Sequence, residues 1–170
     1  MEYISGPMQR KTLREFAKII RKKMCVEDII YLPVVTILEN IMPLLFPGFT
    51  YDIVRNSELP DKRHAETDVV NKIVKIREDV YLGAINGNGR DRMTIMHEIA
   101  HYILIVVYGV KFARNFGGKD IRAYKSPEWQ AKALAGEIMC PHNIIKSLSV
   151  EKVAKKCGVS ISAAKYNLNH

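Results

Sequence analysis

Residues 97–101, HEIAH, combine the side chains that a metal-dependent hydrolase requires. They lie in an apolar stretch, MTIMHEIAHYILIVV, which predicts a helix over residues 91–108. Four residues of an α-helix turn through ~400°, so His97 and His101 project from one face and can bind a single ion. Glu98 is then placed to accept a proton from a metal-bound water. We expect one zinc ion per chain, because a purely structural pair would leave costly buried polar groups without partners.

A third protein ligand is needed, because catalytic zinc usually takes three side chains and keeps a fourth position for water. Glu128 is favoured, since it stands in the first turn of a helix predicted over residues 127–140, where the preceding loop can return it across the site. Glu137 lies nine residues further along, about half a turn out of phase, and is expected on the surface or behind the ligands. The other candidates are His64, His142 and His170.

Peptide hydrolysis has two further requirements, a donor to the tetrahedral oxyanion and a place for the substrate chain. The candidate oxyanion donors are Tyr102, Tyr124 and His142. The extended substrate is expected to pair, by strand addition, with a strand predicted from Val80 to Ile85, just before the helix that carries HEIAH.

The segments before this region form the scaffold. Residues 8–24 have the periodicity of a basic amphipathic helix, whose charged face we interpret as a solvated surface. A second helix is predicted from Pro33 to Leu45. Between residues 49 and 85, short runs rich in β-branched and aromatic residues predict three or four antiparallel strands, with Asn71 and Lys72 at a hairpin tip.

The segments after the HEIAH helix complete the order of predicted elements. Residues 110–126 predict a long basic loop, and residues 149–168 resemble a helix-turn-helix with its break at Cys157 and Gly158. Helices, then a small sheet, then helices favour an α+β fold in a single domain over residues 1–170.

Composition restricts the class of protein. The chain has 170 residues, of which 48% are hydrophobic, and a formal charge of +8, which favours acidic or nucleic-acid partners. Its three cysteines form no CxxC pair, so neither a disulfide framework nor a cysteine zinc cluster is expected. The N-terminal residues do not have the pattern of a signal peptide and no apolar run is long enough to cross a bilayer, so we expect a cytoplasmic protein without a membrane partner.

The two halves of the proposed site resemble a paired signature. HEIAH followed by EWQAKALAGEIMCP is similar to the ImmA/IrrE family of metallopeptidases, in which HExxH precedes a helix of the form E-x-x-A-x-x-(F)-A-x-x-L-x-x-P. The resemblance extends more loosely over most of residues 30 to 168. Leu134 replaces the usual aromatic residue, and Cys140 stands where methionine is common, but both are apolar packing positions.

This resemblance implies a zincin-like core with a small antiparallel sheet packed on helices. It implies that His97, His101 and Glu128 are the zinc ligands and that Glu98 is the catalytic base. It also implies a protein substrate: a helix-turn-helix transcriptional repressor of a phage, another mobile element or a stress response.

The alternative hypothesis is a non-catalytic protein. In that case the chain keeps the zinc-site fold and regulates by protein or DNA binding, with the basic helix and the tail as contact surfaces. Glu98 favours the enzyme, because binding alone does not need a base beside the ligands.

Overall fold

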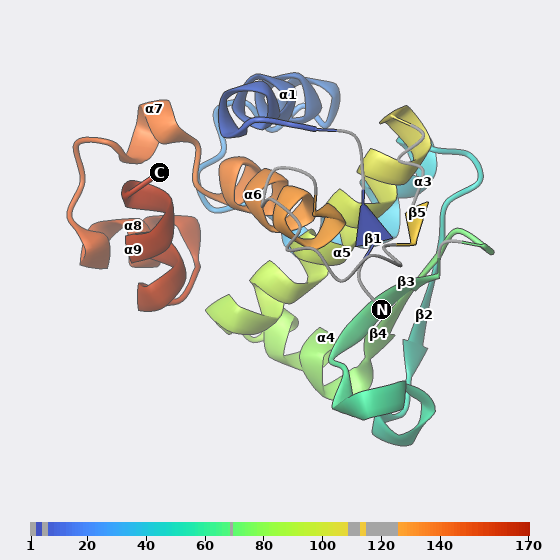
Figure 1. The fold of residues 1–170 in the computed structure, drawn as a ribbon. Helices are drawn as coiled ribbons and strands as arrows, with labels where there is room; N and C mark the ends of the chain where they lie inside the picture. The colour runs from blue at the N-terminus through green and yellow to red at the C-terminus, as the bar shows by residue number, and fades with distance from the viewer. Residues whose placement is uncertain (1–2, 5–6, 69, 109–112, 115–125) are drawn as a thin grey trace.

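The computed structural model describes residues 3–4, 7–68, 70–108, 113–114 and 126–170 (Figure 1). The strands are β1 (Tyr3–Ile4), β2 (Thr50–Val54), β3 (Ala65–Asp68), β4 (Ile73–Arg77) and β5 (Ala113–Arg114). The α-helices are α1 (Arg10–Lys23), α2 (Val34–Thr36), α3 (Met42–Leu45), α4 (Glu78–Ile85), α5 (Gly89–Tyr108), α6 (Pro127–Met139), α7 (His142–Ile145), α8 (Val150–Cys157) and α9 (Ile161–Leu168). A π-helical turn, η1 (Ile37–Ile41), and two 3₁₀ turns, η2 (Asn56–Glu58) and η3 (Pro60–Lys62), complete the described elements.

The fold class is α+β, as predicted, but the three-stranded sheet is mixed rather than antiparallel. Its order is β2-β4-β3, with β2 parallel to β4 and β3 antiparallel to β4. The β3–β4 hairpin confirms the predicted turn, in which Lys72 takes a positive φ of 55°. The all-antiparallel expectation was wrong because β2 does not pair with the next strand in sequence. Instead, residues 55–64 carry the chain past the position that β4 then fills.

The strand predicted from Val80 to Ile85 is also wrong, because this segment is helix α4. Glu78 and Asp79 occupy its first turn, where carboxylates stabilise the positive end of a helix. Val80 and Ala84 are four residues apart and both buried, so the helical spacing prevails over the aromatic and apolar composition that suggested a strand.

Helix α5 is the central element of the core. It packs against α4 and α6, and Figure 1 shows α6 alongside it. It begins two residues before the predicted start, because the side-chain oxygen of Asn88 accepts a capping hydrogen bond from the Asp91 amide at 3.1 Å. The fully buried apolar side chains of α5 are Ile95, Met96, Ile99, Ala100 and Ile103.

The described helices include none that could cross a membrane.

The second predicted helix forms over residues 34–45 with η1 in its middle. A proline within a helix lacks an N–H and crowds the carbonyl four residues earlier. The π-helical turn directly before Met42 and Pro43 accommodates this proline, as single π turns within helices do.

The tail forms the two helices predicted, α8 and α9, joined at Gly158 with φ of 63°. Its turn packs onto the start of α5. Arg92 Nε donates to the Gly158 carbonyl at 2.9 Å, and the Arg92 guanidinium lies 3.9 Å from the Tyr31 ring centroid. A Cβ on Gly89 would lie 2.6 Å from the Val159 backbone. The turn therefore supports the helix that carries HEIAH.

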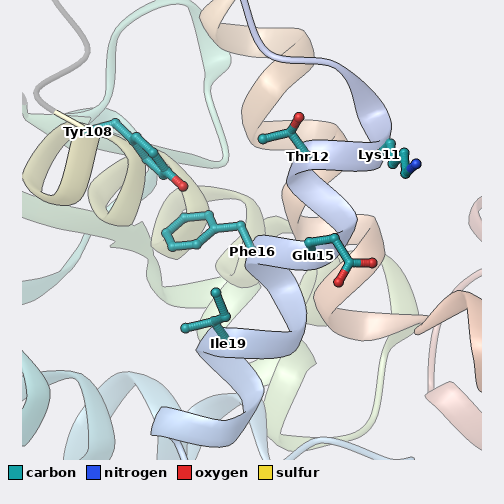
Figure 2. A pocket seen from close by; sticks show the side chains of 6 residues that line it. All are labelled: Lys11, Thr12, Glu15, Phe16, Ile19 and Tyr108. Atoms are coloured by element: carbon teal, nitrogen blue, oxygen red, sulfur yellow. The ribbon is translucent and has the colours of Figure 1, made fainter.

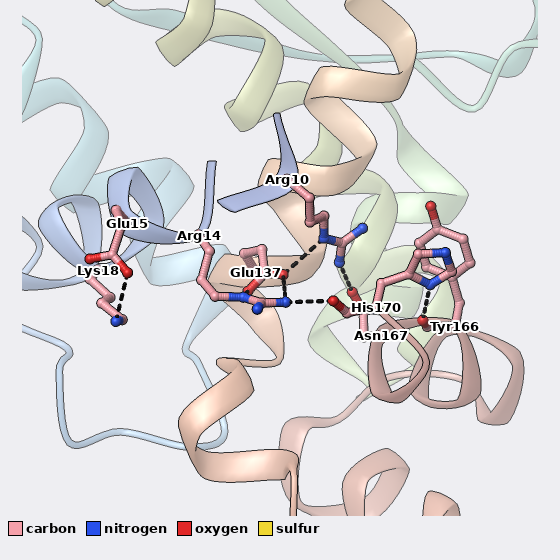
Figure 3. Close-up of polar contacts among 8 residues, drawn as sticks. All are labelled: Arg10, Arg14, Glu15, Lys18, Glu137, Tyr166, Asn167 and His170. Carbon is pink, nitrogen blue, oxygen red and sulfur yellow. Dashed lines mark hydrogen bonds and ion pairs between the residues drawn. The ribbon is translucent and has the colours of Figure 1, made fainter. Parts of the chain in front are cut away.

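Helix α1 buries its apolar face as predicted, but part of its basic face is buried too. Arg10 and Arg14 each bind the Glu137 carboxylate of α6, at 2.9 and 3.0 Å (Figure 3). Arg10 also donates to Asn167 of α9, and Arg14 to the backbone oxygen of His170. Arg21 of the same face is buried as well and donates to the Ile138 carbonyl of α6 at 2.7 Å. The interpretation of this face as wholly solvated was therefore wrong, because three of its guanidinium groups join α1 to α6 and to the C-terminal residues.

We expect Glu137→Gln to lower the free energy of unfolding by about 1–3 kcal/mol, since it leaves two half-buried guanidinium groups without a counter-charge. Urea unfolding followed by circular dichroism measures the change. Glu151→Gln, on the exposed face of α8, is the control and should change stability by less than about 0.5 kcal/mol. An equal effect of the two substitutions would contradict the structural role of Glu137.

Candidate metal centre

Three donor side chains meet where α5 passes the start of α6. His97 and His101 project from one face of α5, with their Nε2 atoms 3.1 Å apart. Glu128 stands in the first turn of α6, which Ser126 caps by accepting from the Trp129 amide at 3.3 Å. The Glu128 carboxylate oxygens lie 3.3 Å from His97 Nε2 and 3.1 Å from His101 Nε2. The site therefore contains two imidazole nitrogens and one carboxylate.

These donors fit a zinc ion in chemistry and spacing. All three ligand atoms lie within 4.8 Å of one another. Two ligands bound to tetrahedral zinc at ~2.05 Å are about 3.3 Å apart, which is close to each separation in the cluster. Two histidines and one glutamate are also a ligand set of catalytic zinc that leaves a position open.

The cluster is reached from the Glu128 side. The Glu128 side chain is 77% exposed, whereas those of His97 and His101 are 24% and 12% exposed. The imidazoles are thus held on the buried helix α5. A fourth metal ligand can approach from the side of the exposed Glu128 carboxylate.

Charge within the cluster favours a bound cation. The hydrogen bonds from His101 and His97 hold the pKa of Glu128 well below its usual range. Burial lowers the pKa of His101, but the Glu128 hydrogen bond and the charges of Glu98 and Glu128 outweigh it, so the pKa is raised. The carboxylates therefore stabilise positive charge at the imidazoles, where a metal ion would replace a proton.

Glu98 is 8% exposed and is held by a residue that sequence reasoning missed. The hydroxyl of Thr67, on β3, lies 2.7 Å from Glu98 Oε2 and 3.1 Å from the Glu98 backbone oxygen. A hydroxyl has one proton, and the shorter contact to the charged oxygen is the stronger bond. Nothing in the sequence pairs residue 67 with residue 98, since this contact depends on how the sheet packs on α5.

Thr67→Val is expected to lower kcat of any hydrolysis at this site by about 10- to 100-fold, the range for losing a hydrogen bond to a charged group. Zinc content and KM should stay the same, because Thr67 is not among the ligands. Thr67→Ser keeps the hydroxyl and should restore most of kcat, whereas a purely packing role would give equal losses in both variants.

Several other predicted residues lie away from the cluster. Tyr102 is buried with its ring 4.8 Å from that of Phe49 and 5.7 Å from that of Phe46, so it is a core residue rather than an oxyanion donor. His142 begins α7, beyond the opposite end of α6 from Glu128, about 18 Å along that helix. Tyr124 lies outside the described residues.

The remaining ligand candidates have other partners. His64 Nε2 lies 2.8 Å from an Arg90 nitrogen, and His170 stacks on Tyr166 with ring centroids 4.3 Å apart. Glu137, expected on the surface or behind the ligands, is buried with Arg10 and Arg14. Of these candidates, the described structure brings only Glu128 to the histidine pair.

A separate pocket of about 360 Å³ lies between α1 and the end of α5 (Figure 2). It is not part of the metal cluster. Its lining residues are Lys11, Thr12, Glu15, Phe16, Ile19 and Tyr108.

Comparison with protein families gives a match. A peptidase family model described as the IrrE N-terminal-like domain matches residues 53–169, from β2 to the end of α9. The matched segment contains HEIAH and Glu128, whereas α1 lies outside it. The search of curated proteins finds no match.

Proposed function

The chain belongs to the IrrE N-terminal-like family of peptidases, and from that premise we propose that it is a zinc-dependent endopeptidase. The observation that carries the proposal is the meeting of His97, His101 and Glu128 at ligand distances, with Glu98 one residue from the first histidine. The α+β architecture, with a small sheet packed on helices, is consistent with a zincin-like peptidase.

The chain's own residues have distinct roles in this reaction. When bound, zinc lowers the pKa of a coordinated water to ~7 and polarises the scissile carbonyl. Glu98 accepts the proton of the attacking water and returns it to the leaving amine. Thr67 holds one oxygen of that carboxylate, so the other oxygen is oriented for proton transfer.

The substrate is best placed along β3. The strand predicted for this role is helix α4, so its backbone cannot accept an added strand. In the described sheet β3 is an edge strand, and Thr67 on it contacts Glu98. An extended peptide pairing with β3 would pass beside the base.

We further propose that the substrate is a helix-turn-helix transcriptional repressor of a phage, another mobile element or a stress response. The proposal rests on the resemblance of the paired signature, and the charge of +8 supports encounter with an acidic protein or with a repressor on DNA.

Mass spectrometry of newly formed protein N-termini tests both proposals. Cells expressing the chain are compared with cells expressing Glu98→Gln, which keeps the proposed ligands. We expect a new N-terminus within a DNA-binding regulator in the first cells only. An identical set of N-termini in both would refute the endopeptidase.

The second candidate is a regulator that acts by protein or DNA binding. It is favoured by the exposed lysines of the two-helix tail, which Glu98→Gln leaves intact. An unchanged biological effect of that variant would support this candidate. The lysines are Lys152, Lys155 and Lys156 on α8 and Lys165 on α9.

A further inference from the structure

One face of α5 carries more than the two histidines. Arg90, Thr94, His97 and His101 follow one another at intervals of four, three and four residues, which places them within about 60° around the helix. Arg90 is therefore on the face that carries the metal cluster, two turns before it.

Arg90 contacts the beginning of β3. Its Nη2 lies 2.8 Å from His64 Nε2, and His64 directly precedes the strand. A guanidinium has no acceptor, so Arg90 donates this bond and the His64 proton is on Nδ1. His64 therefore orients Arg90 without adding a charge.

Two contacts join the start and the middle of β3 to α5. One is His64 with Arg90, and the other is Thr67 with Glu98. Along the strand, His64 lies three residues, about 10 Å, before Thr67. Along the helix, Arg90 lies eight residues, about 12 Å, before Glu98. The lengths agree, so strand and helix run side by side from Arg90 to the base.

The charge of Arg90 is available to a ligand. Arg90 is exposed, and among the residues that the structure describes no carboxylate lies within ion-pair distance of it. The neighbouring Asp91 feels Arg90 electrostatically, but its carboxylate lies against Gly83 of α4. A guanidinium held at one nitrogen still offers donors for a carboxylate.

We propose that Arg90, positioned by His64, is a specificity subsite for an acidic side chain of the substrate, about three residues from the bond that is cleaved. This rests on the proposed peptidase function, and the spacing follows from ~3.3 Å per residue of extended peptide. A peptide antiparallel to β3 would carry the acid on the C-terminal side of that bond, and a parallel one on the N-terminal side.

The test uses a peptide library in which Glu, Gln or Lys is scanned through each position, with zinc-loaded protein and cleavage sites read by mass spectrometry. We expect Glu to be preferred by about fivefold at one position two to four residues from the bond, the scale of one exposed ion pair. Arg90→Gln should abolish this preference, and Arg90→Glu should replace it with one for Lys. Lys155→Gln, on the exposed face of α8, is the charge-matched control and should preserve it.

Binding separates this proposal from the function on which it rests. Fluorescence anisotropy measures the affinity of the same peptides for Glu98→Gln and for Glu98→Gln combined with Arg90→Gln. Weaker binding of Glu peptides, but not of Gln peptides, by the double variant supports the subsite even if no peptide is cleaved. Cleavage without an acidic preference, or a preference that survives Arg90→Gln, overturns the subsite and leaves the peptidase standing.

Discussion

Glu98→Gln is expected to reduce kcat for peptide hydrolysis by about 10³-fold while zinc remains bound. The amide cannot accept a proton from the attacking water, and general-base catalysis contributes roughly 10²–10⁴-fold. Gln has nearly the same shape, and its carbonyl oxygen can still accept the bond from Thr67. Folding and metal content should therefore match those of the unsubstituted chain.

The measurement is kcat on a cleaved peptide, beside zinc content and thermal unfolding of the same preparation. The control is Glu151→Gln, which makes the same chemical change on an exposed helix face. A Glu98→Gln protein that retains more than a tenth of the activity would exclude Glu98 as the base.

The second large effect is the loss of the metal. His97→Ala combined with His101→Ala is expected to reduce zinc from one ion per chain to none, since the remaining carboxylate is a single donor. Glu128→Ala keeps both imidazoles and should weaken binding by more than the ~100-fold that loss of an outer hydrogen bond costs. Elemental mass spectrometry of dialysed protein measures the stoichiometry.

His64→Ala is the matched control for the metal experiment. His64 was a ligand candidate in the sequence, but the structure pairs it with Arg90, so its loss should leave one zinc per chain. Zinc retained by the double histidine variant, or absent from the unsubstituted chain after zinc is added, would refute the three-ligand site.

The histidine pair and Glu128 could be predicted because each depends on local rules. HEIAH lies on a helix whose apolar spacing is unmistakable, and the serine and proline before Glu128 specify the start of the next helix. Only the approach of α6 to α5 needed the structure. The geometry therefore agrees with the ligand role expected of Glu128.

Other features could not be predicted, because they depend on contacts between distant segments. Val80 to Ile85 has the composition of a strand, and its buried positions at helical spacing are evident only against the neighbouring elements. The parallel pairing of β2 with β4 skips the nearer strand β3 in sequence. Thr67 reaches Glu98 across 31 positions, which no spacing rule anticipates.

The ion pairs of Glu137 have a consequence for the boundary of the autonomous folding unit. The family match begins at residue 53, yet Glu137 within it is neutralised by two arginines of α1, and one of these also bonds to α9. Cooperative units of a protein need not coincide with the segment that relatives share. Helices α1, α6 and α9 should therefore open together in native-state hydrogen exchange. A fragment that begins at residue 53 would lack α1, which packs on α6 and covers part of the core.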